Sequence, residues 1–223
     1  MPNSRRGTNS TIMSFKLIQG LFYSEHNMKG KFDNKRIIEA VKEVYDNPEV
    51  GKTSFRPKNS HPHHTFYEDV NLPEDVYNKF VLETQTLIND VCKTDTFSVE
   101  DVWGHILKPG QETTVHAHRS VGGLNEGLAW CYYPHMKKDF GNLHFIADVG
   151  GNRVIHEVKC KASHLYIFSR NVLHFTPINA TKEDRISISG NFNTDWSFLD
   201  NVTKENNIFK YIGQNCAYDS YYN

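Results

Sequence analysis

This 223-residue sequence lacks the features that identify several broad classes of protein. Its four cysteines lie far apart without a CxxC pair, which argues against a zinc ribbon or a disulfide framework: Cys92, Cys131, Cys160 and Cys216. No apolar run approaches the ~20 residues that cross a bilayer, and no signal-peptide core follows the polar N-terminus. We therefore expect reduced thiols, no membrane partner and a cytoplasmic location, in the host cytoplasm if the sequence is viral.

The sequence also lacks an excess of charge of either sign. Lys and Arg total 25 against 26 Asp and Glu, for a formal net charge of −1. Nucleic acid and anionic lipid recruit clustered Lys and Arg, so neither partner is indicated. Internal repeats and low-complexity tracts are absent as well. With 38% hydrophobic residues, the chain suits one globular domain with a continuous core.

The first part of the chain predicts helices. Residues 1–12 are polar and predict a flexible leader. Residues 13–98 predict a helical N-terminal support region, interrupted by a loop at 51–71 that prolines and polar residues break. One amphipathic helix is expected from Asn34 to Tyr45, and a second from Pro73 to Val91.

After Thr94 the apolar pattern changes to period two, which is typical of strands. Eight runs show it: Val99–Leu107, Glu112–His118, Glu126–Tyr133, Asn142–Ala147, Arg153–Lys159, His164–Phe168, Val172–Pro177 and Arg185–Phe192. The fold class predicted is mainly β with flanking α: a double-stranded β-helix, or cupin-like jelly roll, with the N-terminal helices packed on one sheet. We expect this core to span 99–193 and to leave 194–223 as a C-terminal extension of the same domain.

Three histidines in these strands are candidate metal ligands. His116 and His118 stand two residues apart, so they share a strand face and can converge on one ion. Imidazole suits iron, zinc, copper and nickel alike, and a pair of this kind also suits a surface or structural role. His174 is the third candidate, although its large apolar neighbours also suit a core histidine.

The run from Asp184 to Phe192 has one apolar and one polar strand face. Alternation places Ile186, Ile188 and Phe192 on one side, and the polar residues on the other: Arg185, Ser187, Ser189 and Asn191. The polar side suits either a solvent-facing sheet or the lining of a pocket. In a pocket, Arg185 and Ser187 can hold a carboxylate through a charged fork and a hydroxyl.

Together these residues resemble the 2-oxoglutarate/iron(II)-dependent oxygenase superfamily. The resemblance rests on His116-Ala117-His118, His174 and Arg185 with Ser187, which gives an HxH…H…RxS pattern. It is closer to the small oxygenases of phages and marine bacteria and covers about residues 99–193, through further pieces: Trp103, Tyr132-Tyr133-Pro134, Gly141-Asn142-Leu143-His144-Phe145, Phe168-Ser169 and Asn191.

The resemblance implies the cofactors and the chemistry. Iron(II), 2-oxoglutarate as cosubstrate and dioxygen are expected, with C–H hydroxylation as the outcome. Arg185 and Ser187 would anchor the distal carboxylate of 2-oxoglutarate. A tyrosine on a neighbouring strand would bond its other carboxylate, and because only one of Tyr132 and Tyr133 can face inward, we predict Tyr132.

One position departs from the pattern. Most relatives carry Asp or Glu two residues after the first histidine, where this sequence has His118. Either three imidazoles bind the metal, or a carboxylate such as Asp148 or Glu126 reaches in from elsewhere. The spacing and strand parity of His118 favour the first reading.

Two other functions stay open. A cupin-type thiol dioxygenase also uses three histidines, and Arg185 would then bind the carboxylate of its substrate. A non-enzymatic jelly-roll binding or virion-associated module would hold structural zinc or no metal. The sequence does not identify the substrate, which could be a small molecule or a peptide, with prolyl hydroxylation as one family-level option. It also leaves open the oligomeric state and the roles of His61–His64 and of the tyrosine-rich tail.

Overall fold

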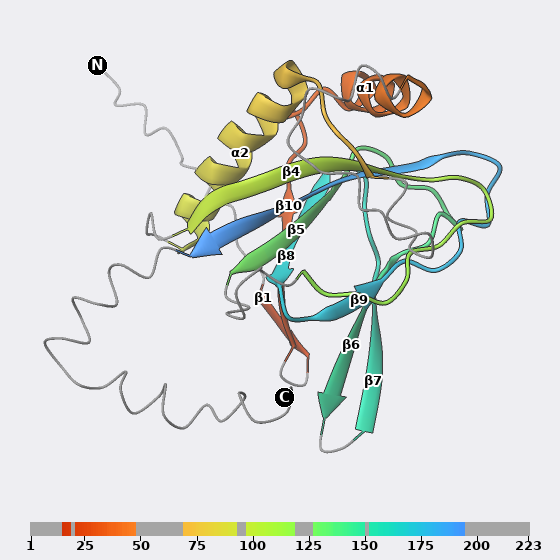
Figure 1. Cartoon of the computed structure of the whole chain (residues 1–223). Helices are drawn as coiled ribbons and strands as arrows, with labels where there is room; N and C mark the ends of the chain where they lie inside the picture. Colours follow the sequence, from red (N-terminus) through yellow and green to blue (C-terminus); the bar gives the residue numbers. More distant parts are fainter. Residues whose placement is uncertain are drawn as a thin grey trace, which may run out of the picture.

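The computed structural model describes residues 15–18, 21–47, 69–92, 97–118, 127–149 and 152–194. Within them, antiparallel strands form two sheets, and two helices lie on one side (Figure 1). The predicted leader, the histidine tract at 61–64, Glu126 and nearly all of the C-terminal extension lie outside the described residues.

The larger sheet has seven strands in the order β1-β2-β8-β5-β10-β4-β3. Their bounds are β1 Phe15–Ile18, β2 Leu21–Asn27, β8 His164–Ser169, β5 Leu128–Tyr133, β10 Arg185–Thr194, β4 Phe97–Leu107 and β3 Asp69–Val70. The smaller sheet has the order β7-β6-β9, with bounds β7 Asn152–Val158, β6 Leu143–Val149 and β9 Leu173–Phe175. The β6–β7 hairpin extends beyond the body of the molecule (Figure 1).

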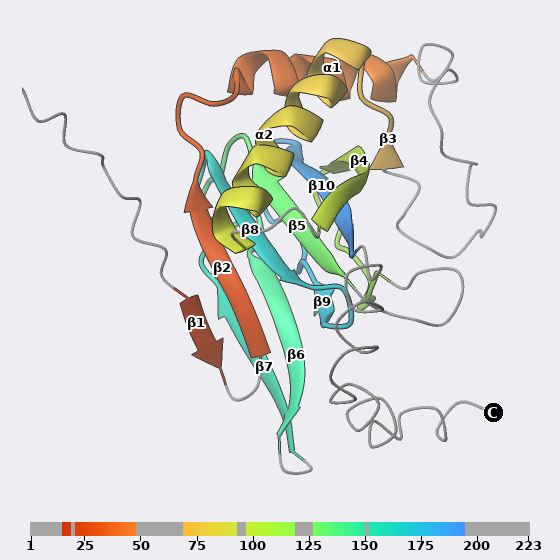
Figure 2. The same ribbon diagram turned by 90° about the vertical axis from the view of Figure 1, so that its left-hand side faces the viewer.

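Two helices cover one face of the larger sheet (Figure 2). Helix α1, Asn34–Asp46, begins at Asp33, whose carboxylate accepts hydrogen bonds from the backbone N–H groups of Lys35 and Arg36, each at 3.1 Å. Helix α2, Glu74–Cys92, opens with two acidic residues, which the positive end of its dipole favours. Both helices were predicted from their apolar stripes, and both are confirmed. No helix in the described residues combines the length and apolar character needed to cross a membrane.

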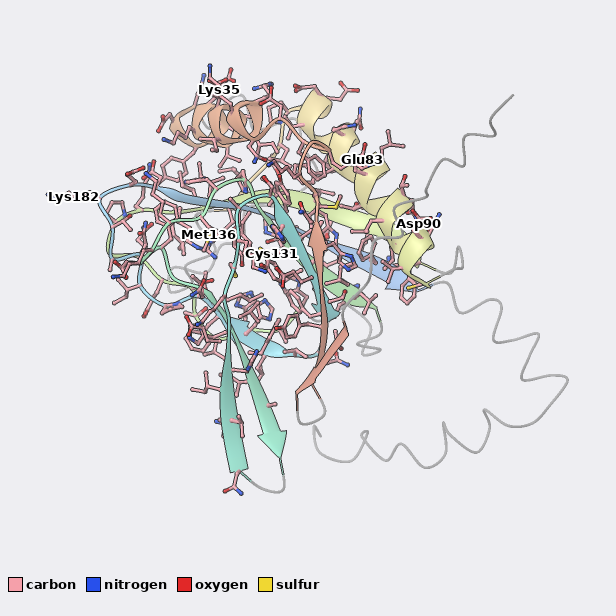
Figure 3. All side chains as sticks on the ribbon, turned by 180° about the vertical axis from the view of Figure 1, so that it is seen from behind. Lys35, Glu83, Asp90, Cys131, Met136 and Lys182 are labelled. Carbon is pink, nitrogen blue, oxygen red and sulfur yellow. The ribbon has the colours of Figure 1, made fainter. Side chains whose placement is uncertain are left out.

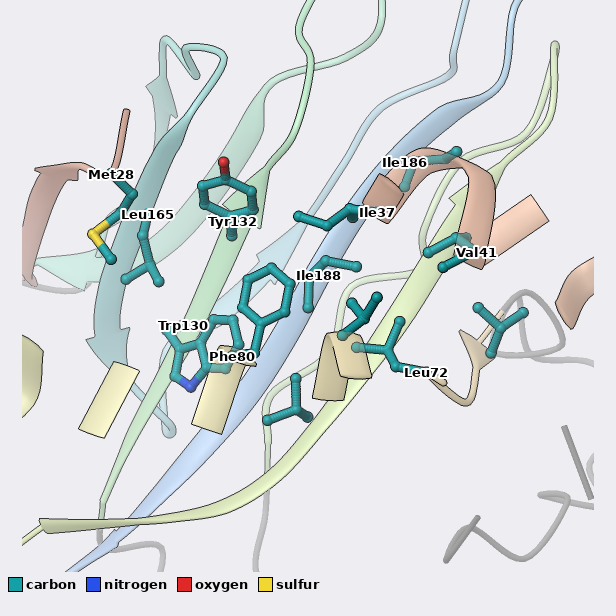
Figure 4. Close-up of a cluster of buried hydrophobic side chains, with 14 of the residues drawn as sticks. Met28, Ile37, Val41, Leu72, Phe80, Trp130, Tyr132, Leu165, Ile186 and Ile188 are labelled. Atoms are coloured by element: carbon teal, nitrogen blue, oxygen red, sulfur yellow. The ribbon is translucent and has the colours of Figure 1, made fainter. Parts of the chain in front are cut away.

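The core between the helices and the larger sheet is apolar (Figure 4). Phe80 of α2 stacks on Trp130 of β5 at a centroid distance of 5.9 Å. Ile186, Ile188 and Phe192 of β10 are fully buried there, on the strand face where alternation placed them. Gly190 has no side chain, and a Cβ at this position would collide with the Trp130 ring. We call this side of the larger sheet the helix face.

A second core joins the two sheets on the opposite side. Tyr23, Tyr133 and Phe168 of the larger sheet pack with Leu143 and Phe145 of the smaller one. The Phe145 ring lies 5.6 Å from Tyr23 and 5.0 Å from Phe168, centroid to centroid. We call this side of the larger sheet the inter-sheet face. Charged side chains such as Lys35 and Lys182 lie at the periphery of the molecule, while Cys131 lies within it (Figure 3).

The N-terminal region is not purely helical, so that prediction was wrong in part. It contributes β1 and β2, and β2 pairs with β8 as part of the larger sheet. Sequence periodicity missed β2 because polar residues are buried on its helix face, where Ser24 Oγ hydrogen-bonds His26 Nε2 at 2.8 Å. The predicted strand 112–118 is also different: it joins β9 through one isolated bridge between His116 and His174.

Candidate metal centre

The three predicted histidines come together on the inter-sheet side. His116 and His118 lie in the extended segment after β4, and His174 lies in β9. His116 N donates to His174 O at 3.0 Å, and His174 N donates to His116 O at 2.8 Å, so the two segments are held side by side. One ring nitrogen from each histidine lies within 4.8 Å of the others. The rings are therefore close enough to share one metal ion.

Hydrogen bonds fix the protonation of all three rings. The Nδ1 atoms of His116 and His174 each lie 2.8 Å from the backbone carbonyl oxygen two residues earlier, of Thr114 and Val172. The Nδ1 atom of His118 lies 2.7 Å from Asn191 Oδ1. Because each partner is an acceptor, each Nδ1 carries the proton and donates it. With Nδ1 as the donor, Nε2 is the ring atom that can bind a metal, the arrangement that metal-ligating histidines use.

Aromatic rings lie against two of the three histidines. The Phe168 ring lies 4.9 Å from that of His174, and the Trp103 ring lies 5.5 Å from that of His118. Burial is the main cause that lowers the pKa of His118 to about 4 and that of His174 well below its ordinary value. Near neutral pH both imidazoles are uncharged, which is the form that binds metal.

Side chains from β10 and from the turn after β8 hold His118 at two points. Asn191 in β10 accepts from its ring, and Asn191 Nδ2 donates in turn to Asp101 Oδ1 at 2.9 Å. The backbone of His118 is held by Arg170, which is 3% exposed. Arg170 Nε donates to His118 O at 3.3 Å, and its Nη1 is fixed by Glu100 Oε2 at 2.6 Å. Sequence reasoning gave no role to Arg170 or Asp101.

Arg185 lies in the same inter-sheet space and is 1% exposed. Its Nε donates to Gly141 O at 3.2 Å, and one Nη donates to Thr176 Oγ1 at 3.3 Å. No carboxylate in the described part of the chain forms an ion pair with it. A buried cation with two weak neutral partners is costly unless an anion joins it. Thr176 follows His174 by two residues, so the guanidinium binds the same chain segment that carries one of the three histidines.

The polar side of β10 is buried, so it is not an ordinary solvent face. Ser187 is 2% and Asn191 4% exposed, and both share the inter-sheet face with Arg185. Ser187 is also the register partner of His105 in β4. The sequence alternatives for this strand are therefore resolved in favour of an internal lining.

Tyr132 does not face the site, and that prediction was wrong. It lies in the core beneath the helices, where its hydroxyl donates to Asn34 Oδ1 at 2.5 Å. Tyr133 faces the site instead, with the Arg185 guanidinium 5.0 Å from its ring centroid. Its buried hydroxyl has the Cys131 and Cys160 thiols as neighbours, which are only weak hydrogen-bond partners. Burial raises the pKa of Tyr133 well above its ordinary value, so this hydroxyl remains protonated and can donate.

The carboxylate alternatives for the third ligand fall outside what the structure describes. Glu126 and the side chain of Asp148 both lie there. Among the described residues, the group of three ligand side chains consists of the histidines alone. Three neutral imidazoles fit a borderline divalent ion such as iron(II), and they also fit zinc or copper.

A surface hollow of about 790 Å³ lies apart from this centre. Lysines dominate its charged lining, and Lys137 within it is paired with Glu183. None of the three histidines lines it. Gly141, whose carbonyl accepts from Arg185, forms part of its wall, so the hollow lies outside the guanidinium rather than beside the histidines.

Comparison with known proteins supports the fold. No protein-family model matches the chain, and neither does any curated protein. Among solved structures, it is similar to SnoN, a non-heme alpha ketoglutarate dependent epimerase from nogalamycin biosynthesis, at 12% identity with a TM-score of 0.54, covering 77% of this chain and 76% of that one. The carbocyclase SnoK from the same biosynthesis, also non-heme and alpha ketoglutarate dependent, gives 13% identity and a TM-score of 0.51, covering 80% and 85%.

AviO1 from Streptomyces viridochromogenes Tue57 is similar at 10% identity with a TM-score of 0.52, covering 76% of this chain and 88% of that one. At these identities the likeness shows a shared fold. The chemistry has to be argued from the residues of this chain.

Proposed function

We propose that this chain is a non-haem iron(II), 2-oxoglutarate-dependent dioxygenase of the double-stranded β-helix type, acting as a hydroxylase. The observation that carries the proposal is the pairing of two features in one buried space. A cluster of three imidazoles offers ring nitrogens to one ion, and a buried guanidinium that has no carboxylate partner among the described residues binds the segment that follows His174. A short dicarboxylate that also carries a metal-chelating keto group satisfies both.

Each residue has a defined task in this proposal. His116, His118 and His174 would hold iron(II), which when bound supplies the activation of dioxygen coupled to decarboxylation of the keto acid. Arg185 binds the distal carboxylate, and Ser187 stands two residues further along the same strand face to assist. Tyr133 donates its hydroxyl to the cosubstrate, taking the role first predicted for Tyr132. Aromatic rings beside His118 and His174 lower the local polarity, which strengthens these electrostatic interactions.

Charge balance favours a dianionic cosubstrate. Three neutral imidazoles place no negative charge directly on the ion, whereas one carboxylate ligand would remove half of its double positive charge. Arg185 adds a further positive charge at the other end of the space. The site therefore has a positive charge at each end, matching the two carboxylates of 2-oxoglutarate.

The test begins with wild-type protein prepared without metal and loaded anaerobically with iron(II). Addition of 2-oxoglutarate should give an iron–keto-acid charge-transfer band, and oxygen should then yield succinate. His174→Ala should reduce both to background, while His144→Ala should leave them unchanged, because His144 stacks on Phe175 away from the cluster. Wild-type protein that shows neither the charge-transfer band nor succinate formation would rule the proposal out.

The all-imidazole ligand set favours one second candidate, a thiol dioxygenase. Arg185 would then bind the carboxylate of an amino-acid thiol. Oxygen consumption with a thiol and without any keto acid would identify it. A metal-binding module without catalysis would instead hold zinc in a closed site. For the substrate that is hydroxylated, the proposal includes a peptidyl (for example prolyl) or small-molecule acceptor in the cytoplasm.

A further inference from the structure

His118 differs from the other two histidines in what supports its ring. His116 and His174 donate from Nδ1 to backbone carbonyls of their own segments, which are neutral acceptors. His118 donates to the side chain of Asn191, on a different strand. His118 also occupies the position where a carboxylate stands in the pattern that the sequence resembles. The unusual ligand and the unusual support therefore coincide.

A carboxylate lies one step behind the ring. Asn191 and Asp101 are direct register partners on β10 and β4. The Asn191 amide donates to Asp101 Oδ1 at 2.9 Å, and its carbonyl accepts from His118 Nδ1 at 2.7 Å. Because an ionised carboxylate only accepts, Asp101 fixes which way the amide points. We call the chain of hydrogen bonds from Asp101 through Asn191 to His118 the relay. Asn191 is 4% exposed, so water competes little for these hydrogen bonds.

Such a relay affects a metal ligand in two ways. An acceptor at Nδ1 holds the proton there and leaves Nε2 as the donor atom to the metal. A negative charge at the far end polarises both hydrogen bonds and makes the imidazole a stronger electron donor. The charge that a carboxylate ligand would bring is then present in the support of the ring rather than on the ion.

We propose that Asp101 and Asn191 are positioning residues of the metal centre, which select the Nε2-ligating form of His118 and supply through hydrogen bonds the negative charge that its imidazole lacks. The inference rests on the proposed function only in requiring that the three histidines bind a divalent metal. In this proposal the HxH segment provides the His118 ring, and the larger sheet provides the side chains that orient it. Asp101 on β4 and Asn191 on β10 would therefore act together on one ligand.

Four variants separate geometry from charge. Asn191→Ala removes the acceptor, and Asp101→Asn keeps an acceptor for the amide but removes the charge. The double variant D101N/N191D exchanges the two groups, so that a carboxylate bonds His118 directly and an amide lies behind it. Ser189→Ala is the matched control, because Ser189 shares the strand face but contacts Cys131 Sγ. Each protein is titrated with Co(II) alone, and the His118 tautomer is read by ¹⁵N NMR of the metal-free chain.

We expect Asn191→Ala to weaken Co(II) binding by about 10- to 100-fold, the usual effect of losing the support of a ligand, and to give a mixed His118 tautomer. Asp101→Asn should weaken binding less while the tautomer is kept. The exchanged double variant should bind within a few-fold of wild type or more tightly. Ser189→Ala should match wild type in both measurements.

Unchanged affinity and tautomer in folded Asn191→Ala would overturn the inference. If that variant does not fold, Asp101→Asn and the exchanged pair decide: equal affinity for Asp101→Asn and wild type, or loss of binding in the exchanged pair, overturns it equally. Wild-type protein that binds no divalent metal is a different outcome, because it removes the proposed function itself.

Discussion

Strand β10 is buried on both faces of the larger sheet, but its side chains on the two faces have opposite chemistry. On the helix face, Ile188 and Trp130 pack against Phe80 and add to the free energy of folding through apolar burial. On the inter-sheet face, Arg185 and Asn191 are almost as buried yet polar. Burial of such groups opposes folding unless partners compensate it. The first face accounts for stability, and the second would account for binding in the proposed function.

The largest effect is expected from Ile188→Ala on the helix face. Removing its buried side chain should lower the free energy of unfolding by about 2–5 kcal/mol. Urea unfolding followed by tryptophan fluorescence measures this change. The folded fraction should still bind one Co(II) per chain. A loss below ~1 kcal/mol would mean that the helix face is not the main stabilising layer.

Arg185→Met on the inter-sheet face should impair binding of 2-oxoglutarate without lowering stability, the reverse of Ile188→Ala. Loss of the charged hydrogen bonds to a carboxylate should raise the KM for 2-oxoglutarate by about 10- to 100-fold, because such bonds contribute roughly 1.5–3 kcal/mol. The free energy of unfolding should stay the same or rise, because a buried cation without a carboxylate partner is removed. Succinate formation and urea unfolding test the two parts. A variant that unfolds more easily with an unchanged KM would contradict the assignment.

A third prediction concerns His26, a buried ring on the helix face. Burial lowers its pKa in the folded protein from 6.5 to about 4. Its contribution to stability is therefore complete above pH 6.5, where both states are neutral. It is lost as the pH falls toward 4, at up to about 1.4 kcal/mol per pH unit, because only the unfolded chain takes up the proton.

Urea unfolding of wild type and His26→Gln at pH 7.5 and 5 isolates this term. The variant should lose less stability between the two pH values than wild type does. Equal losses in the two proteins would show that His26 is not the titrating group.

The smallest effects come from a pair of adjacent tyrosines, one on each face. Tyr132→Phe removes the hydrogen bond to Asn34 and should cost about 1 kcal/mol of stability without changing the KM for 2-oxoglutarate. Tyr133→Phe removes a hydroxyl whose neighbours are weakly hydrogen-bonding thiols, and it should change stability little while raising that KM a few-fold. The opposite assignment of the two effects would restore Tyr132 as the site residue.

These tyrosines also show where sequence reasoning stops. In β10 the apolar and polar residues alternate strictly, so the inward face of Arg185 and Ser187 could be predicted. In β5 both faces are buried, with Trp130 and Tyr132 on one side and Cys131 and Tyr133 on the other. Without a polar face, alternation shows that Tyr132 and Tyr133 point apart but not which one points inward.

Other features depend on contacts between distant segments. The spacing and parity of the three histidines predicted their convergence, because a strand period fixes which side chains share a face. Arg170 and Asp101 act through partners on other strands, and nothing near them in the sequence marks that role. The strand β2 was missed for a related reason, since its buried Ser24 and His26 satisfy each other and break the apolar pattern.

The isolated bridge between His116 and His174 has a consequence for the life of the protein in a cell. An ion bound by both segments would act as a cross-link, and its binding free energy would be added to the free energy of folding. Metal-poor chains would open more often at this bridge and be degraded sooner, because proteolysis follows the population of open forms. The amount of protein present would then rise and fall with the supply of iron, before any change in its synthesis.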